Sequence, residues 1–198
     1  MTSAPLPDLL SLAVQVAMGL GLAACAGLRA FLPLLVVGLA GRLELVPLSE
    51  SFAWLATGPA LVVLSVAVVA ELLADKVPVV DHALDALGTL VKPGAGTLVA
   101  ASVLTDLPPL PTAVLALCTG GAVSAGVHLT KAKVRLLSTA ATAGIGNPLL
   151  SVLEDVGAVI GSVAALVVPL LVAALFLAAL VGLLVLLAAR RARAHSLP

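Results

Sequence analysis

The stretch "LLSLAVQVAMGLGLAACAGLRAFLPLLVVGLA", residues 9–40, decides the fold of this protein, because its only strongly polar side chains are Gln15 and Arg29. A single helix of this length would extend about 50 Å, whereas the hydrocarbon layer of a membrane is about 30 Å thick. Pro33 has no N–H to donate to the carbonyl of Arg29, so the helix weakens where the charge lies. We therefore expect one membrane crossing that is kinked or broken near residues 27–33.

Composition places the whole chain in the membrane. Hydrophobic residues make up 62% of the 198 residues and charged residues only 10%, whereas a soluble domain is about half apolar and about a quarter charged. The composition therefore predicts an all-α polytopic membrane helix bundle, a single integral-membrane domain over residues 1–198. Ten Lys and Arg balance ten Asp and Glu, so no global electrostatic field attracts nucleic acid.

Four further apolar regions follow the first one. One crossing is expected from about Trp54 to Ala74 and another from Thr112 to about Leu129. Residues 94–104 form either a half-helix or a crossing that the preceding segment extends. Residues 149–189 would make a helix about 60 Å long, twice the hydrocarbon thickness, so a hairpin bent near Pro169 is expected. The count is about six membrane-embedded segments, some of them kinked or short.

Basic side chains predict the orientation. Lys and Arg gather at residues 131–135, before the last hairpin, and at 190–193, after it. Two crossings return both groups to one face, which the positive-inside rule makes cytoplasmic. Residues 42–52 and 105–111 then face outward, and both chain termini are expected in the cytoplasm. Residues 1–8 lack the basic segment of a secretory signal, so we expect the chain to stay in the inner (plasma) membrane.

Acidic residues concentrate in "ELLADKVPVVDHALDAL", residues 71–87. Glu71 and Asp75 are four residues apart and share a helical face, but Pro78 prevents one continuous helix through the whole segment. Two neighbouring carboxylates need a cation, a proton or a basic partner where water is scarce. Glu71 and Asp75 therefore either gate protons or bind a hard cation, or they form a solvated helix end that Lys76 balances.

A second acidic group follows Pro78. A metal site there would combine a histidine with carboxylates, but no recognised metal-ligand spacing is present. A solvated helix end is therefore the favoured interpretation, and no metal or cofactor is predicted. The residues concerned are Asp81, His82 and Asp85.

Arg29 needs a partner, because a guanidinium within an apolar span costs at least about 2.5 kcal/mol unless a carboxylate, a carbonyl or water compensates it. Glu71 or Asp75 is the first candidate. Glu154 or Asp155 is the second. A structural ion pair between helices and an anion or substrate site both account for this arginine.

Three basic side chains share the spacing of one helical face: His128, Lys131 and Arg135 stand at i, i+3 and i+7. Anchoring in lipid headgroups is the favoured interpretation of these cations. A helix that continues past Leu129 would place all three on one face, and their charge complements that of the net acidic segment 71–92. We expect the two segments to meet, so that acids and cations neutralise one another around one hydrated pocket.

The segment "STAATAGIGNP", residues 138–148, is small and polar. Irregular backbone there would form either part of a binding site or an interfacial loop, and the loop is favoured. Asn147 and Pro148 are typical of a helix start, and "SVLE", residues 151–154, reads as a capping box that explains Glu154. Asp155 has no such structural explanation.

Small and polar motifs give the chain a family resemblance. "GLRAFLPLL" (27–35), "ELLADKVPVVDHALD" (71–85) and "STAATAGIGNPLLSVLED" (138–155) occur in this order. In this combination the chain resembles the uncharacterised bacterial membrane family named domain of unknown function 4126. The resemblance implies a small multi-pass protein and brings no activity, substrate or site residue with it.

Two function classes remain open. The first is a transporter or channel for an ion or small solute, with Arg29, Glu71 and Asp75 as the polar site. The second is a non-catalytic membrane scaffold or assembly partner, because "CTGGAVSAG" (118–126) offers a small-residue face for helix packing or a homo-oligomer. An enzyme is the least favoured class, since no hydrolase, metalloprotease or P-loop motif appears. Cys25 and Cys118 are expected to be buried small residues.

Overall fold

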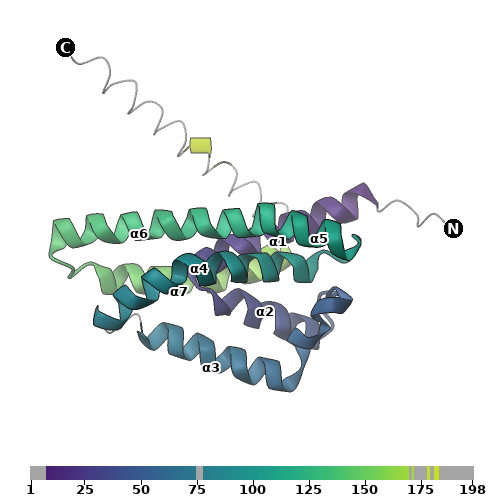
Figure 1. The fold of residues 1–198 in the computed structure, drawn as a ribbon, viewed down its shortest axis with the longest axis horizontal. Helices are drawn as coiled ribbons and strands as arrows, with labels where there is room; N and C mark the ends of the chain where they lie inside the picture. The colour runs from purple at the N-terminus through teal and green to yellow at the C-terminus, as the bar shows by residue number, and fades with distance from the viewer. Residues whose placement is uncertain (1–7, 75–77, 170, 172–177, 179–180, 183–198) are drawn as a thin grey trace, which may run out of the picture.

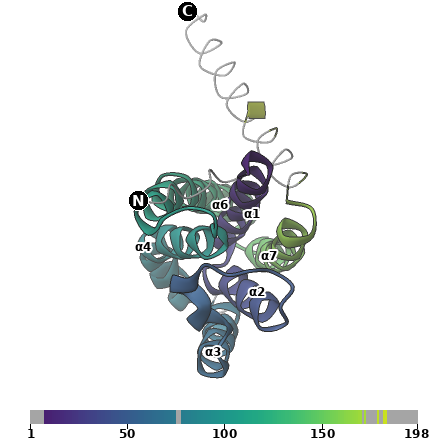
Figure 2. The same cartoon turned by 90° about the vertical axis from the view of Figure 1, so that its right-hand side faces the viewer.

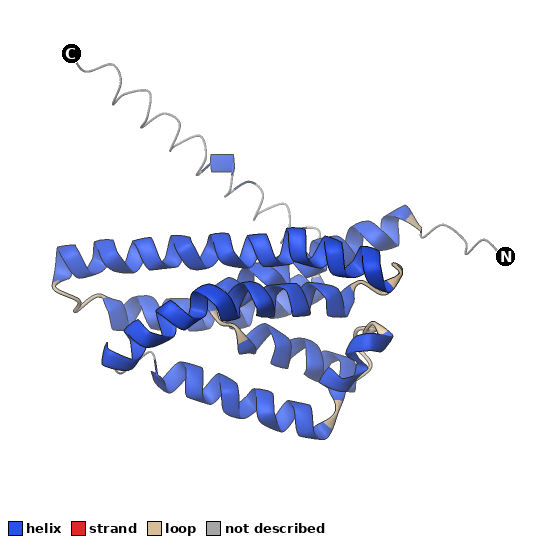
Figure 3. Ribbon diagram, in the orientation of Figure 1, coloured by secondary structure: helices blue, strands red, loops and turns tan. Residues whose placement is uncertain are grey.

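The computed structural model describes residues 8–74 and 78–169, together with 171, 178, 181 and 182, and the side chains of 78–86 lie outside this description. Within the described residues the chain is helical and contains no strand (Figure 3). The all-α prediction is confirmed. In chain order the elements are α1 (Leu9–Leu28), α2 (Phe31–Arg42), the 3₁₀ helix η1 (Glu50–Ala56), α3 (Gly58–Ala74), α4 (Pro78–Val103), α5 (Pro109–Leu115), the π-helix η2 (Ala116–Gly121), α6 (Ala122–Thr142) and α7 (Asn147–Val167).

The long N-terminal apolar stretch breaks where the sequence predicts. Helix α1 ends at Leu28, and Arg29 adopts an extended conformation with φ −132° and ψ 114°. Helix α2 then begins at Phe31, so Pro33 lies in its first turn. A proline is tolerated there because the N–H groups of a first turn have no intrahelical acceptor.

The direction of α2 differs from the prediction of a single crossing. In Figure 1, α1 and α2 run in opposite directions on either side of the break. The Oε1 atom of Gln15 accepts the N–H of Thr105 at 2.9 Å, and the N–H of Ser49 donates to the carbonyl of Ser102 at 2.9 Å. Because both contacts lie where α4 ends, the start of α1 and the connection after α2 share one end of the bundle. Residues 9–40 therefore do not form one continuous kinked helix: α1 is long enough to cross a membrane by itself, and α2 is a shorter apolar helix that turns back.

The other predicted boundaries shift in ways that the backbone explains. Helix α3 begins at Gly58 and follows η1 at a bend of 68°, so the predicted segment from about Trp54 to Ala74 is not one straight helix. Residues 94–103 belong to a 26-residue α4 that continues through Pro93, so the preceding segment extends this stretch as the second alternative requires. Its described apolar part, Leu87–Val103, is one of the shorter apolar helices, and a full crossing there stays a prediction. Helix α7 ends at Val167, just before Pro169, and the second arm of the expected hairpin lies outside the described residues.

The apolar helices are of two lengths. Three helical stretches of the described chain are long and apolar enough to cross a membrane, or four if the bent pair η1 and α3 makes one span. The three are Leu9–Leu28, Pro109–Thr142 and Asn147–Val167, and shorter apolar helices occur at Phe31–Arg42 and Leu87–Val103. Residues 112–129 thus lie within a longer helical stretch than predicted. The protein is a helical membrane bundle with long and short members.

Helix α1 forms the centre of the bundle. It packs against α2, α4, α6 and α7, as the end-on view shows (Figure 2). Its apolar side chains contribute to a core in which Leu22, Ala23 and Ala26 are fully buried. Helix α3 lies at the periphery, mainly against α2 and η1. Its outer valines are exposed and suit contact with lipid.

Glycines allow α4 to approach η2 closely. A Cβ atom on Gly120 would lie 2.6 Å from the carbonyl oxygen of Gly96, closer than real Cβ atoms come to backbone. The two cysteines differ in this packing: Cys25 is buried, as predicted, but Cys118 is exposed. The prediction that Cys118 is buried is wrong, because the small face of η2 that meets α4 consists of Gly120 and Gly121.

Candidate functional site

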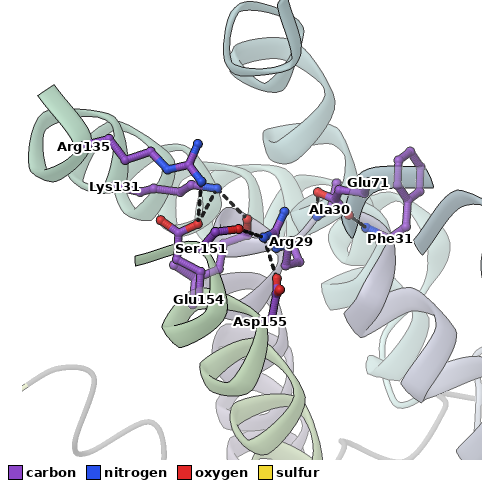
Figure 4. A network of polar contacts seen from close by, with 10 residues as sticks. Arg29, Ala30, Phe31, Glu71, Lys131, Arg135, Ser151, Glu154 and Asp155 are labelled. Atoms are coloured by element: carbon purple, nitrogen blue, oxygen red, sulfur yellow. Dashed lines mark hydrogen bonds and ion pairs between the residues drawn. The ribbon is translucent and has the colours of Figure 1, made fainter. Parts of the chain in front are cut away.

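The break between α1 and α2 is the centre of the candidate site. The last carbonyls of α1 and the first N–H groups of α2 have no intrahelical partners, and each needs one away from water. Arg29 lies in the break with only 1% of its surface exposed. Side chains from three other helices supply the missing contacts (Figure 4).

Helix α7 supplies the partners of Arg29. The Nη2 atom of Arg29 lies 2.5 Å from Oδ1 of Asp155 and donates to the Oγ atom of Ser151 at 2.9 Å. Ser151 and Asp155 are one helical turn apart, so both reach the same guanidinium. The second predicted partner set for Arg29 is therefore confirmed through Asp155. The sequence did not lead us to predict Ser151 as a partner of Arg29, although its spacing of four residues from Asp155 places both side chains on one helical face.

Glu71 of α3 has a different role from the one predicted. Its Oε1 atom accepts the N–H of Ala30 at 2.9 Å, and its Oε2 atom accepts the N–H of Phe31 at 3.3 Å. The carboxylate therefore caps α2, whose N-cap residue Ala30 offers no side-chain acceptor. The prediction that Glu71 pairs with Arg29 is wrong, because these N–H groups engage the carboxylate.

Lys131 and Arg135 of α6 meet Glu154 of α7. The Nζ atom of Lys131 lies 2.9 Å from Oε2 of Glu154, and Nη2 of Arg135 lies 3.4 Å from the same oxygen. Lys131 also donates to the carbonyl of Leu28 at 3.4 Å, at the negative end of the α1 dipole. One carboxylate thus joins two cations beside the end of α1.

The basic face of α6 turns inward. His128, Lys131 and Arg135 are 2%, 6% and 5% exposed, respectively. The expected helical alignment is confirmed, but the interpretation as lipid-headgroup anchors is wrong, since the face packs against protein. The ring Nε2 of His128 lies 3.5 Å from Oγ1 of Thr89 on α4. Exposed Lys133 on the same helix matches the expected behaviour of a surface cation.

The start of α7 corrects the expected capping box. Asn147 and Pro148 begin the helix, as predicted, so Ser151 and Glu154 lie inside it and not at its cap. Within the segment 138–148, residues 143–146 leave helical form and the others are helical. The amide of Asn147 donates to Oγ1 of Thr139 at 2.9 Å and so ties α7 to the end of α6. Asn147 thus has a structural contact of its own.

Of the acidic segment, residues 71–87, the structure describes the side chains of 71–74 and 87. Helix α4 lies against α6, and the Oγ atom of Ser124 donates to the carbonyl of Lys92 at 2.7 Å. Helices α3 and α4 run in opposite directions (Figure 1), which confirms that the whole segment is not one continuous helix. Asp75 and Lys76 lie outside the described residues, as do the side chains of Asp81, His82 and Asp85, so their part in the cluster stays a prediction.

A cavity opens beside the break. It has a volume of about 430 Å³ and lies between the start of α2, the end of α3 and the middle of α4. Glu71 and the buried Lys92 are the ionisable side chains of its described lining. The other lining residues are apolar or small: Ala30, Phe31, Ala67, Ala70, Ala74, Leu87, Gly88 and Val91. Among the described residues no group of three metal-ligating side chains accompanies it.

Lys131→Met is expected to lower the free energy of unfolding by about 3 kcal/mol, because it leaves the partly buried Glu154 with one cation fewer and removes a donor from Leu28. Lys133→Met on the exposed face should change stability by less than about 0.5 kcal/mol. Unfolding of the purified variants by SDS titration in mixed micelles measures both. Equal effects of the two substitutions would contradict the buried position of Lys131.

The fold and the cluster define a helical membrane protein with a broken apolar helix that buried ion pairs hold in place. The chain belongs to the family described as Domain of unknown function (DUF4126), whose model matches residues 16–190. The family resemblance of the sequence motifs is thereby confirmed. No curated protein and no solved structure matches the chain.

Proposed function

We propose that this protein moves a small solute or ion across the membrane, using the cavity beside the α1–α2 break as its binding site. The observation that carries the proposal is the position of that cavity. It adjoins the start of α2, the helix that follows the break, and includes Glu71, the side chain that caps α2. Broken helices at membrane depth are stable only against protein or a wet cavity, and transporters place their binding sites at such breaks.

Helix α3 is the element suited to move. It lies at the periphery and has few contacts with α4, its neighbour across the cavity. Through Glu71 it nevertheless holds the N-terminus of α2. A solute that interacts with Glu71 would change how α3 meets the break, so binding and opening are coupled through one carboxylate.

The proposed orientation places the ion pairs of Arg29 with Asp155 and of Lys131 and Arg135 with Glu154 toward the cytoplasmic face of the inner membrane. Lys131 and Arg135 contact Glu154 of α7, and Lys131 also contacts the end of α1 (Figure 4). Lys133 is exposed on the same helix, so the positive-inside rule assigns this side of the bundle to the cytoplasm. In this orientation the loop around Asp106 faces outward, as the sequence predicts. The described start of α1 lies at the same end, so the proposal places it outside rather than in the cytoplasm, where the sequence predicts the N-terminus. At that outer end hydrogen bonds from Ser11 and then Gln15 lower the pKa of the Asp106 carboxyl.

Flux through reconstituted vesicles tests the transport proposal. Vesicles that contain the protein are loaded in turn with labelled sodium, potassium, choline and glycine, and a pH dye reports protons. We expect at least one probe to leave faster than from protein-free vesicles. Glu71→Gln should reduce that flux by about tenfold or more, since the site loses its charge.

Glu50 offers the matched control. It is an exposed glutamate in η1, at the far end of the bundle, so Glu50→Gln should leave the flux unchanged. Two results would contradict the proposal: transport fails if no probe leaves faster than from empty vesicles, and the cavity fails as the binding site if Glu71→Gln supports the wild-type rate.

A scaffold is the second candidate, and one observation favours it. Glu71, Lys131 and Asp155 each contact the break directly or through Arg29, so the network suffices to brace the fold without a ligand. In that case Glu71→Gln lowers the thermal stability of the protein, while the wild type carries no flux at all. Stability and flux measured on the same preparations separate the two functions.

A further inference from the structure

Three features of the cavity bear on the chemistry of its ligand. The first is its wall. Ala67, Ala70 and Ala74 stand at i, i+3 and i+7 of α3 and form a smooth apolar surface, with Leu87 and Val91 of α4 also in the lining. The volume of about 430 Å³ is toward the lower end of the range for ligand sites. Such a wall suits a small ligand whose surface consists largely of methyl or methylene groups.

The second feature is the charge of Glu71. Glu154 has two cationic partners and Asp155 has one, but among the described residues no Lys or Arg forms an ion pair with Glu71. Its two oxygens accept two backbone N–H groups, and a carboxylate offers about four acceptor positions. A carboxylate against an apolar cavity at membrane depth favours a positive ligand.

The third feature is an aromatic ring next to this carboxylate. Phe31 lines the same cavity, and its own N–H donates to Glu71, so the backbone holds the ring and the carboxylate close together (Figure 4). Aromatic residues make up only 2% of the chain. A cation over an aromatic face gains further attraction, which is strongest where water is excluded.

Groups that would bind an anion are occupied. Lys92 reaches the cavity from α4, but it is buried and has an interaction of its own. The N–H groups of Ala30 and Phe31, which form the positive end of α2, already donate to Glu71. An anionic solute would have to displace the Glu71 carboxylate from these N–H groups, whereas a cation can bind to the carboxylate without breaking these hydrogen bonds.

We propose that the cavity between α2, α3 and α4 binds a small organic cation of the alkylammonium class, with its charge between the Glu71 carboxylate and the Phe31 ring. The alanine wall of α3 receives the alkyl groups. This ligand assignment rests on the proposed function, since it names the solute class of the same site.

Choline and its uncharged isostere 3,3-dimethyl-1-butanol form the probe pair, with 3,3-dimethylbutyrate as the anion. Binding of labelled choline to the purified full-length protein is measured at equilibrium, and all three probes are compared by thermal shift. Choline alone should raise the melting temperature. Glu71→Gln should weaken choline binding about tenfold or more, and Phe31→Leu about threefold or more.

The matched controls lie in η1 at the far end: Glu50→Gln and Phe52→Leu should bind choline as the wild type does. Phe31→Leu keeps both N–H contacts to Glu71, so it reports on the ring even if Glu71→Gln does not fold. Equal stabilisation by the uncharged or anionic probe overturns the proposal, and so does undiminished choline binding to both variants.

Failure of the ligand assignment and failure of the transport proposal give different results. Choline that binds through Glu71 and Phe31 without crossing the vesicle membrane supports the cation site and argues against transport. Flux of another probe without any choline binding supports transport and overturns the cation site.

Discussion

Arg29→Met is expected to lower the free energy of unfolding by about 3–5 kcal/mol, the range for breaking a buried ion pair by removing one partner. The substitution leaves the partly buried Asp155 without this cation and takes a donor from Ser151. It also leaves the ends of α1 and α2 less firmly attached to α7. SDS titration in mixed micelles, followed by circular dichroism, measures the change.

Arg42→Met is the matched control for this loss. Arg42 is exposed and, among the described residues, donates to the carbonyl of Ala56, so its replacement should change stability by about 0.5 kcal/mol or less. Exchanging the charges, Arg29→Asp with Asp155→Arg, should restore part of the loss that each single substitution causes. If Arg29→Met proves as mild as Arg42→Met, the arginine does not hold the break together.

Gly96→Ala is expected to destabilise the protein by about 1–3 kcal/mol, the usual effect of overpacking a close-packed interior. A Cβ atom at this position would lie 2.4 Å from Cβ of Ser124 and 2.7 Å from the carbonyl oxygen of Gly120. Backbone cannot move aside as a flexible side chain does, so α4 and η2 must separate. Thermal unfolding of the purified variant measures the loss.

Gly94→Ala in the same helix provides the opposite result. Nothing lies within 4 Å of a Cβ atom at Gly94. An alanine there should be neutral or stabilise α4 by up to about 1 kcal/mol through its higher helix propensity. Because Gly96 and Gly120 meet at one crossing, combining alanines at both should cost less than the sum of the single effects. Similar values for Gly94→Ala and Gly96→Ala would contradict the close approach.

Local signals in the sequence predicted several features of the site. A charge beside Pro33 within an apolar stretch predicted a break near residues 27–33, and the chain breaks at Arg29. Asn147 and Pro148 predicted the start of α7. The need of a buried guanidinium for a carboxylate limited the partners of Arg29 to four, of which Asp155 is one. Each of these predictions depends on short-range chemistry or on a single large desolvation cost.

Interpretations that required knowing which helices are neighbours were less successful. We interpreted Lys131 and Arg135 as surface cations, because their periodicity defines a helical face but does not indicate which helices pack against that face. Helices α1 and α7 cover that face, and Glu154 compensates the charges. We interpreted Glu71 as a partner of Arg29 because opposite charges attract. In the structure its carboxylate instead accepts hydrogen bonds from two N–H groups at the start of α2.

Apolar content, charge scarcity and the order of prolines and polar residues by themselves determined that this protein is a helical membrane bundle with a break beside Arg29. These properties are local, because lipid demands internal hydrogen bonding and penalises each uncompensated charge wherever it occurs. Only the tertiary structure decided that α2 turns back, that α7 provides the carboxylate for Arg29, and that a cavity remains beside Glu71. Those outcomes depend on how side chains from distant segments fill common space, and that is a property of packing rather than of any one segment.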